Sequence, residues 1–319
     1  MTDIHSGDAA VAPSLAPSLT PALAHALSHP GARAPLEISL VRDLPALPAA
    51  VFELLELLGR DDVGTPALVA KISLDQALTA KTLRLANSSF YGMPRHVASV
   101  SDATAVLGLR TVRVVLTAAA LHGSFKPPEC AGFEFMAFWR HAVSTAVCAR
   151  LIANEIGADA EAAFTAGLLH DIGKLILASS HPGRYAEVLA QHAHSGAPLR
   201  AVEAEWLGID HSQVGTRVAE HWRFPKLIVD AITDHHAPSP DSTAFALVRI
   251  VHVAVLLARA LGTGAPAAPA AAAGALAPLD PHTPGHAAWL GLGLSCDAWG
   301  RLGADAELQT QSICAAMLN

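Results

Sequence analysis

Residues 163–174 read Ala-Phe-Thr-Ala-Gly-Leu-Leu-His-Asp-Ile-Gly-Lys, and this segment decides the fold that the sequence predicts. On an ideal helix over residues 161–178, the Phe, Leu and Ile side chains fall on one broad apolar side. His170, Asp171 and Lys174 share the opposite arc. An imidazole, a carboxylate and an ammonium within one turn can hold a divalent metal and contact a phosphate. A solvated polar face explains this helix equally well.

Three further histidines favour a common site. His141, His211 and His235 each share the apolar stripe of a separate predicted helix, so we expect all three to point inward. A lone inward histidine is usually a hydrogen-bonded core residue, but several beside a His-Asp pair predict convergence on one point. Asp210 and Asp234 each precede an inward histidine and are candidates to orient it. Adjacent helical residues point about 100° apart, which favours capping or exposure for both.

The composition predicts an all-α protein. Of the 319 residues, 52% are apolar and only 5% aromatic, and the apolar residues are mostly Ala, Leu and Val, which favours helices.

The net charge of -7 provides no general basic surface, so we expect no direct binding to nucleic acid. The four cysteines are too widely spaced for a CxxC metal site and too few for a secreted disulfide framework. A reducing cytosol fits best.

We expect a cytoplasmic protein with no membrane association. The N-terminus carries Asp3 and Asp8 where a signal peptide needs basic residues and then an apolar run. The most hydrophobic stretch, residues 244–261, is long enough to span a membrane but is interrupted by Arg249 and Arg259. It is therefore predicted to be a core helix.

Proline, glycine and capping residues, which interrupt or end helices, divide the chain into five parts. They are a disordered leader at 1–35, an N-terminal helical lobe at 36–132, a second helical lobe at 133–261, an Ala/Pro/Gly-rich linker or loop at 262–285, and a C-terminal helical segment at 286–319. The helices expected in the second lobe cover residues 135–156, 161–178, 183–194, 199–207, 210–222, 225–236 and 244–261. A short helix is expected at 304–318.

Six segments, in order, carry a resemblance to a known family. They are residues 44–48 (LPALP), 85–91 (LANSSFY), 105–108 (AVLG), 138–141 (FWRH), 163–174 and 211–215 (HSQVG). Over residues 36–261 the chain resembles the HDOD domain, the HD-related output domain of bacterial signalling proteins. That domain is similar in turn to the HD superfamily of metal-dependent phosphohydrolases. The resemblance implies an all-α, two-lobed fold with an HD-like second lobe.

The resemblance also implies a site. The positions that match metal ligands of active relatives, such as HD-GYP phosphodiesterases, are His141, His170, Asp171, His211, His235 and His236. Lys174 matches a lysine near the scissile phosphate in those relatives. Two departures put hydrolysis in doubt. Ala237-Pro238-Ser239 stands where active relatives continue with a carboxylate and Gly-Tyr-Pro, and Val255 stands where they usually place a ligand Asp.

The scarcity of carboxylates favours one metal ion over two. Dinuclear hydrolysis needs bridging carboxylates to hold two cations close together, and Asp171 is the only obvious one. A mononuclear site of imidazoles and one carboxylate, holding Fe, Mn, Mg or Zn, remains chemically reasonable. Its role would be structural, residual or ligand-sensing.

Two functions follow from the resemblance. HDOD domains are generally regarded as regulatory, so the first is a noncatalytic module that acts through a signalling protein partner. The loop at 87–93, with Phe90 and Tyr91, is a candidate docking surface, unless both rings pack between the lobes. The alternative is a metal-dependent phosphohydrolase of a nucleotide or cyclic dinucleotide, with Asp171 and Lys174 as its catalytic residues. Nucleotide binding without cleavage lies between the two.

Overall fold

The computed structural model describes residues 36, 69–70, 72–73, 76–87, 95–239, 244–263 and 285–318. Within these ranges every regular element is a helix and none is a strand, which confirms the predicted all-α class. The expected leader at 1–35, the candidate docking loop with Phe90 and Tyr91, and most of the expected linker lie outside the described residues.

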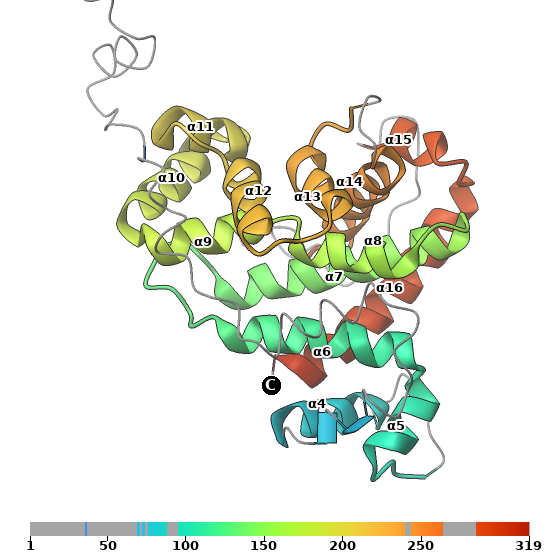
Figure 1. Ribbon diagram of the computed structural model, residues 1–319. Helices are drawn as coiled ribbons and strands as arrows, with labels where there is room; N and C mark the ends of the chain where they lie inside the picture. The colour runs from blue at the N-terminus through green and yellow to red at the C-terminus, as the bar shows by residue number, and fades with distance from the viewer. Residues whose placement is uncertain are drawn as a thin grey trace, which may run out of the picture.

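The first lobe contains α4 (Gln76–Ala86), α5 (Val100–Leu107) and α6 (Leu109–Ser124), shown in Figure 1. The side chain of Asn87 holds the start of the following segment against α4, because it both accepts from and donates to the backbone of Val97. Ser99 caps α5 by accepting from the Asp102 amide. Gly108 joins α5 to α6 with φ +77°, a conformation that disfavours residues with a Cβ.

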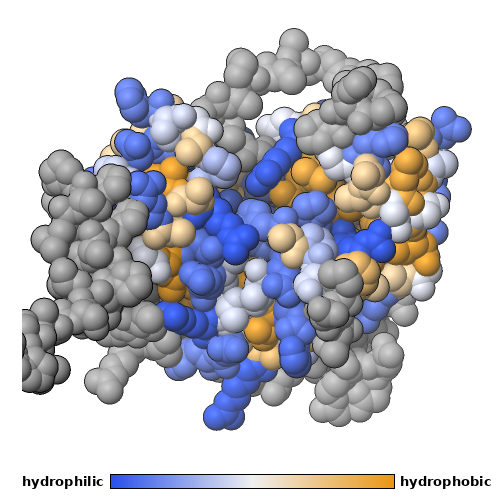
Figure 2. All heavy atoms as spheres, turned by 90° about the horizontal axis from the view of Figure 1, so that it is seen from above, coloured by the Kyte–Doolittle hydropathy of each residue, from blue (hydrophilic) through white to orange (hydrophobic). Residues whose placement is uncertain are grey.

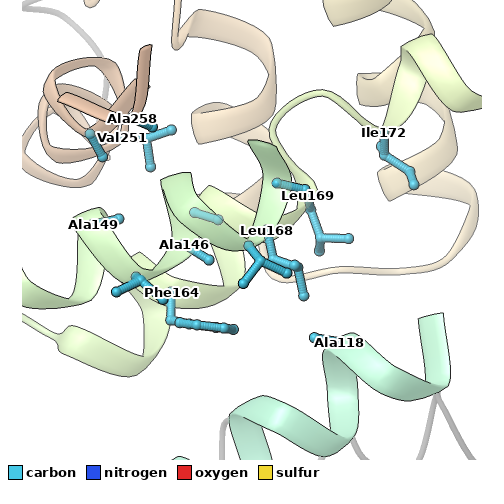
Figure 3. Packing of buried hydrophobic residues seen from close by; sticks show 14 of the residues in the cluster. Ala118, Ala146, Ala149, Phe164, Leu168, Leu169, Ile172, Val251 and Ala258 are labelled. Carbon is cyan, nitrogen blue, oxygen red and sulfur yellow. The ribbon is translucent and has the colours of Figure 1, made fainter. Parts of the chain in front are cut away.

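The second lobe is built around α7 (Phe135–Glu155). This helix packs on α8 (Ala160–Leu169) and on α14 (Phe245–Ala260), and Figure 3 shows the small side chains Ala146 and Ala149 beside Phe164 and Leu168. Gly167 permits the close approach of α8, because a Cβ there would lie 2.9 Å from Ala146 Cα. The remaining helices are α9 (Ile172–Ser180), α10 (Pro182–Ser195), α11 (Leu199–Leu207), α12 (His211–His221) and α13 (Lys226–Asp234).

The apolar helix α14 lies in the core, as its sequence predicts. Val248, Val251 and Leu257 are fully buried. No helix in the described part of the chain combines the length and the apolar character needed to cross a membrane.

The C-terminal segment joins the two lobes. It forms α15 (His286–Gly291) and α16 (Cys296–Met317), and α16 begins eight residues before the start predicted at Ala304. Gly300 and Gly303 weaken helix propensity there, but burial of Trp299 and Leu302 outweighs that weakness. Figure 1 shows α16 running beneath α7 toward α4, and it contacts α4, α6 and α7.

The helix expected over residues 161–178 is interrupted, which corrects the prediction of one continuous polar arc. α8 ends at Leu169 and α9 begins at Ile172, with Asp171 between them at φ -104° and ψ 12°. His170 is completely buried and Asp171 is only 3% exposed, so the solvated-face alternative is wrong. The break turns both side chains into the protein instead of leaving them on the outer face of a helix.

Gly173 fixes the distance between α9 and α12. A Cβ at Gly173 would lie 1.9 Å from the carbonyl oxygen of His211 and 2.8 Å from the amide nitrogen of Gly215. Only a residue without a side chain permits this approach, because both obstacles are backbone atoms. The first turns of α9 and α12 therefore lie in contact, with Asp171 and His211 beside that contact.

We expect Gly173→Ala to lower the free energy of unfolding by at least about 1–3 kcal/mol, the usual cost of overpacking a core. The added methyl group must push α12 away from α9, so metal binding should weaken as well. Denaturant unfolding and metal titration would measure both effects. Gly183→Ala in α10 is the matched control, because a Cβ there meets nothing within 4 Å. Equal behaviour of the two variants would contradict the prediction.

Candidate metal centre

The structure brings the seven site residues predicted from the sequence together between α7, α8, α9, α12 and α13. His141 lies within α7, His170 and Asp171 form the break after α8, and Lys174 lies in the first turn of α9. His211 begins α12, and His235 and His236 follow the end of α13.

Asp171 lies at the middle of this arrangement, with each carboxylate oxygen facing a different pair of imidazoles. Its Oδ2 is 3.2 Å from His170 Nε2 and 3.9 Å from His141 Nε2. Its Oδ1 is 3.4 Å from His211 Nε2 and 3.7 Å from His235 Nε2. The carboxylate therefore separates two sets of nitrogen donors.

Two groups of side chains have the geometry to hold a metal ion, and they share Asp171. In each group the candidate ligand atoms lie within 4.8 Å of one another. The first group comprises Asp171, His211, His235 and His236, and the second comprises His141, His170 and Asp171. Among the described residues, Asp171 is the only carboxylate in either group.

The buried atoms of the centre fit a metal. His170 Nε2, His235 Nε2 and Asp171 Oδ1 are all buried without a hydrogen-bond partner. Unpartnered buried polar atoms are costly, and each of these three atoms is of a kind that coordinates divalent ions. Nitrogen and carboxylate donors of this kind suit Zn, Fe or Mn, whereas Mg prefers oxygen ligands throughout.

Burial keeps several of the imidazoles neutral. It lowers the pKa of His141 to about 3 and the pKa of His235 to about 4. Burial, reinforced by the repulsion that a protonated ring would meet from protonated His235 or His211, lowers the pKa of His236 to about 2. A metal binds the neutral ring, so these side chains need not lose a proton to act as ligands at neutral pH.

Asp171 remains ionised although it is buried. Burial raises the pKa of its carboxyl group, but interactions with His170 and Lys174 outweigh burial and hold the pKa well below its usual value. The Lys174 ammonium donates to Asp171 Oδ2 at 2.6 Å. The centre therefore presents a carboxylate anion.

Helix ends orient two of the rings. His170 Nδ1 lies 2.7 Å from the carbonyl oxygen of Gly167 near the end of α8, and His235 Nδ1 lies 2.8 Å from the carbonyl oxygen of Ile232 near the end of α13. A carbonyl can only accept, so each Nδ1 carries a proton, and the neutral form of each ring offers the lone pair of its Nε2 on the side of Asp171. Carbonyls are free for this role because the last turn of a helix leaves them without backbone partners.

Glu203 orients His211, and the sequence reasoning missed it. This α11 residue is fully buried, and its Oε2 accepts from both the backbone amide and Nδ1 of His211. Its Oε1 accepts from the hydroxyl of Tyr185 at 2.8 Å. A carboxylate on the far nitrogen fixes the tautomer of a metal-binding histidine and makes it a better ligand. The sequence did contain a signal, because Glu203 lies four residues from both Leu199 and Leu207 on the apolar stripe of its helix.

Asp210 has a different role from Glu203. It caps α12 by accepting from the Gln213 amide at 2.9 Å, and it pairs with Arg200 at 2.6 Å. The capping alternative considered for this residue is therefore correct. Asp234, the other aspartate that precedes an inward histidine, is the half-buried last residue of α13.

Val255, which stands where active relatives usually place a ligand Asp, lies on α14. His252 of this helix reaches the site region, because its Nδ1 lies 2.8 Å from the carbonyl oxygen of His235. Val255, one turn further along, is buried and has no atom that can bind a metal. The helix thus supports the segment after α13 without adding a carboxylate at the position of Val255.

We expect Glu203→Gln to weaken metal binding about 10–100-fold, because the neutral amide is a poorer partner for His211 Nδ1 than the carboxylate. Competition with a chelator would measure the dissociation constant for Zn²⁺. Glu155→Gln is the matched control, since Glu155 pairs with Arg301 at the surface. Unchanged affinity in folded Glu203→Gln protein would show that Glu203 does not support the metal ligand.

Comparisons with known proteins relate the chain to solved structures and to curated relatives. A crystal structure of a proposed phosphohydrolase from Shewanella amazonensis superposes with a TM-score of 0.70, at 28% identity, over 87% of this chain and 96% of that chain. An uncharacterized protein of Treponema pallidum is 27% identical over 198 residues, and Ribonuclease Y of Thermus thermophilus is 33% identical over 109 residues.

The two curated relatives are much longer than their matching parts. The matches cover 61% and 34% of this chain, but only 38% and 14% of the Treponema and Thermus proteins. The HDOD domain family, in contrast, matches residues 44–238, well over half of the chain. The chain belongs to the HDOD domain family.

Proposed function

We propose that this chain is a regulatory HDOD module that binds a single divalent metal ion and acts through a signalling protein partner. The observation that carries the proposal is the charge of the centre. Among the described residues, Asp171 is the only carboxylate in either candidate ligand group, although the two groups together contain five histidines. A pair of cations sharing a nucleophilic water needs more negative charge than one carboxylate provides.

A single ion suits the same donors well. Imidazoles with one carboxylate are a common donor set for Zn²⁺ and Fe²⁺. When bound, such an ion would link α12 and the end of α13 to Asp171 between α8 and α9. Its binding would therefore stabilise one arrangement of these helices, which is what a regulatory module requires.

The protein surface over the metal centre is hydrophilic in its central part. Figure 2 shows hydrophilic residues across the middle of the face that α11 to α14 form in Figure 1, with apolar residues to either side. Lys174 and His236 keep part of their surface exposed, whereas His170 and His211 are buried. This arrangement supports access of a small polar ligand, such as a nucleotide, to the edge of the centre.

A metal-dependent phosphohydrolase is the second candidate. The 33% identity to part of Ribonuclease Y and the Lys174 ammonium beside Asp171 favour it. In that function the metal would supply a hydroxide, while Lys174 would neutralise charge on the phosphoryl group. The missing carboxylates weigh against efficient turnover.

We expect purified protein to show no turnover of nucleotides or cyclic dinucleotides with Mn²⁺, Fe²⁺, Zn²⁺ or Mg²⁺. Product formation followed by chromatography would test this expectation. Turnover that Asp171→Asn abolishes would establish the phosphohydrolase and refute the noncatalytic proposal. Turnover that survives in Asp171→Asn would indicate a contaminating enzyme.

We expect a specific protein partner to bind the metal-loaded chain more tightly than Asp171→Asn. Affinity capture from the lysate of its own cell, with both proteins as bait, would reveal it. Asp230→Asn, which removes the surface ion pair with Lys226, is the matched control. Failure of every bait to retain a specific protein, together with unchanged signalling after deletion, would contradict the regulatory proposal.

A further inference from the structure

We infer that Lys174 acts as a built-in cation in place of a second metal ion, and that it confines the metal to the side of Asp171 that faces His211 and His235. This inference rests on the proposed metal centre and adds the number of ions and their position. In this inference the charge of Lys174 controls where the metal binds, and the side chain does not serve to contact a phosphate.

The first support is the contact of Lys174 with one carboxylate oxygen. Its Nζ lies 2.6 Å from Asp171 Oδ2. The two residues are three apart, and the backbone amide of Lys174 donates to the Asp171 carbonyl at 2.9 Å, so the start of α9 holds them together. The lysine side chain is 16% exposed and the aspartate side chain is 4% exposed, so solvent screens this pair only weakly.

The second support is the asymmetry of the carboxylate. Oδ2 already accepts from an ammonium, and only His141 and His170 accompany it in the second ligand group. Oδ1 is buried with no hydrogen-bond partner and faces His211 and His235. An ion on the Oδ1 side therefore finds a free oxygen, whereas an ion on the Oδ2 side must compete with Lys174 for the same oxygen.

The third support is the number of donors on the Oδ1 side. His236 Nε2 lies 2.8 Å from His211 Nε2, which brings a third imidazole to this group. Three imidazoles and one carboxylate oxygen make four donors, the usual number for a structural zinc ion. The Oδ2 side supplies two imidazoles and an oxygen that is already paired.

The distribution of charge points the same way. Glu203 is fully buried and contacts His211, so a second negative charge lies behind the Oδ1 group. The ammonium of Lys174 adds positive charge to the Oδ2 group. A divalent cation is attracted to the first side and repelled from the second.

Zinc stoichiometry of the full chain tests the inference. Each protein is dialysed against chelator-buffered Zn²⁺, and the metal per chain is measured by mass spectrometry. Asp171→Asn sets the background from other histidines, including those at 5, 25 and 29. Above that background we expect one ion in the wild type, two in Lys174→Met and one in Lys174→Arg, which keeps the cation.

Lys226→Met is the matched control, because Lys226 also pairs with an aspartate, Asp230 at 2.7 Å, but at the surface and away from the centre. It should bind one ion. Thermal unfolding of each apo protein shows whether the variants are folded. If Lys174→Met does not fold, the zinc content per chain of Lys174→Gln and of the wild type tests the inference instead.

The outcomes separate this inference from the proposed function. Two ions in the wild type, or one ion in folded Lys174→Met, would refute the role of Lys174 while leaving the metal centre intact. Binding at the Asp171→Asn background in every variant would refute the metal centre itself. Zinc in Lys174→Met but none in the wild type would also refute the one-metal function, because the natural chain would then exclude every ion.

Discussion

The burial of one carboxylate, Asp171, determines the arrangement around it. An ionised carboxylate inside a protein requires compensating charge or polar partners, because desolvation is otherwise prohibitive. Here the compensation comes from the ammonium of Lys174 on Oδ2, whereas Oδ1 has no hydrogen-bond partner and is left for the proposed metal ion. The break between α8 and α9 turns Asp171 inward, and Gly173 allows α12 to bring His211 within 3.4 Å of it.

Apolar periodicity predicted which histidines meet, because a ring on a buried stripe must point toward the common core. His211 and His235 illustrate this, since each follows a helical stripe and both face Asp171. The same reasoning did not predict the break at Asp171, because the apolar spacing continues from α8 into α9 across it. It also overlooked Glu203, because a buried acid is rarely expected without its partner, and that partner lies on α12.

The C-terminal helix α16 is a second case in which the local sequence alone does not predict where a helix begins. Its first turns contain two glycines, yet they are helical because Trp299 and Leu302 pack into the core formed with α7. α7 in turn carries His141, so one helix contacts both the metal centre and the segment that joins the lobes. Neither α16 nor the first lobe can shift far without disturbing the packing of α7, because protein interiors are packed at crystal-like density.

Binding of a metal can serve this fold even without catalysis. On the side of the centre where we place the ion, His235 Nε2 and Asp171 Oδ1 are buried without partners, and each such group costs about 1–3 kcal/mol in the folded protein. An ion that binds the folded state and not the unfolded chain offsets that cost in proportion to the logarithm of its free concentration. The stability of the second lobe is then coupled to metal availability. Hydrolysis needs additional negative charge around the ions, but this coupling needs only the ligands that the chain already places together.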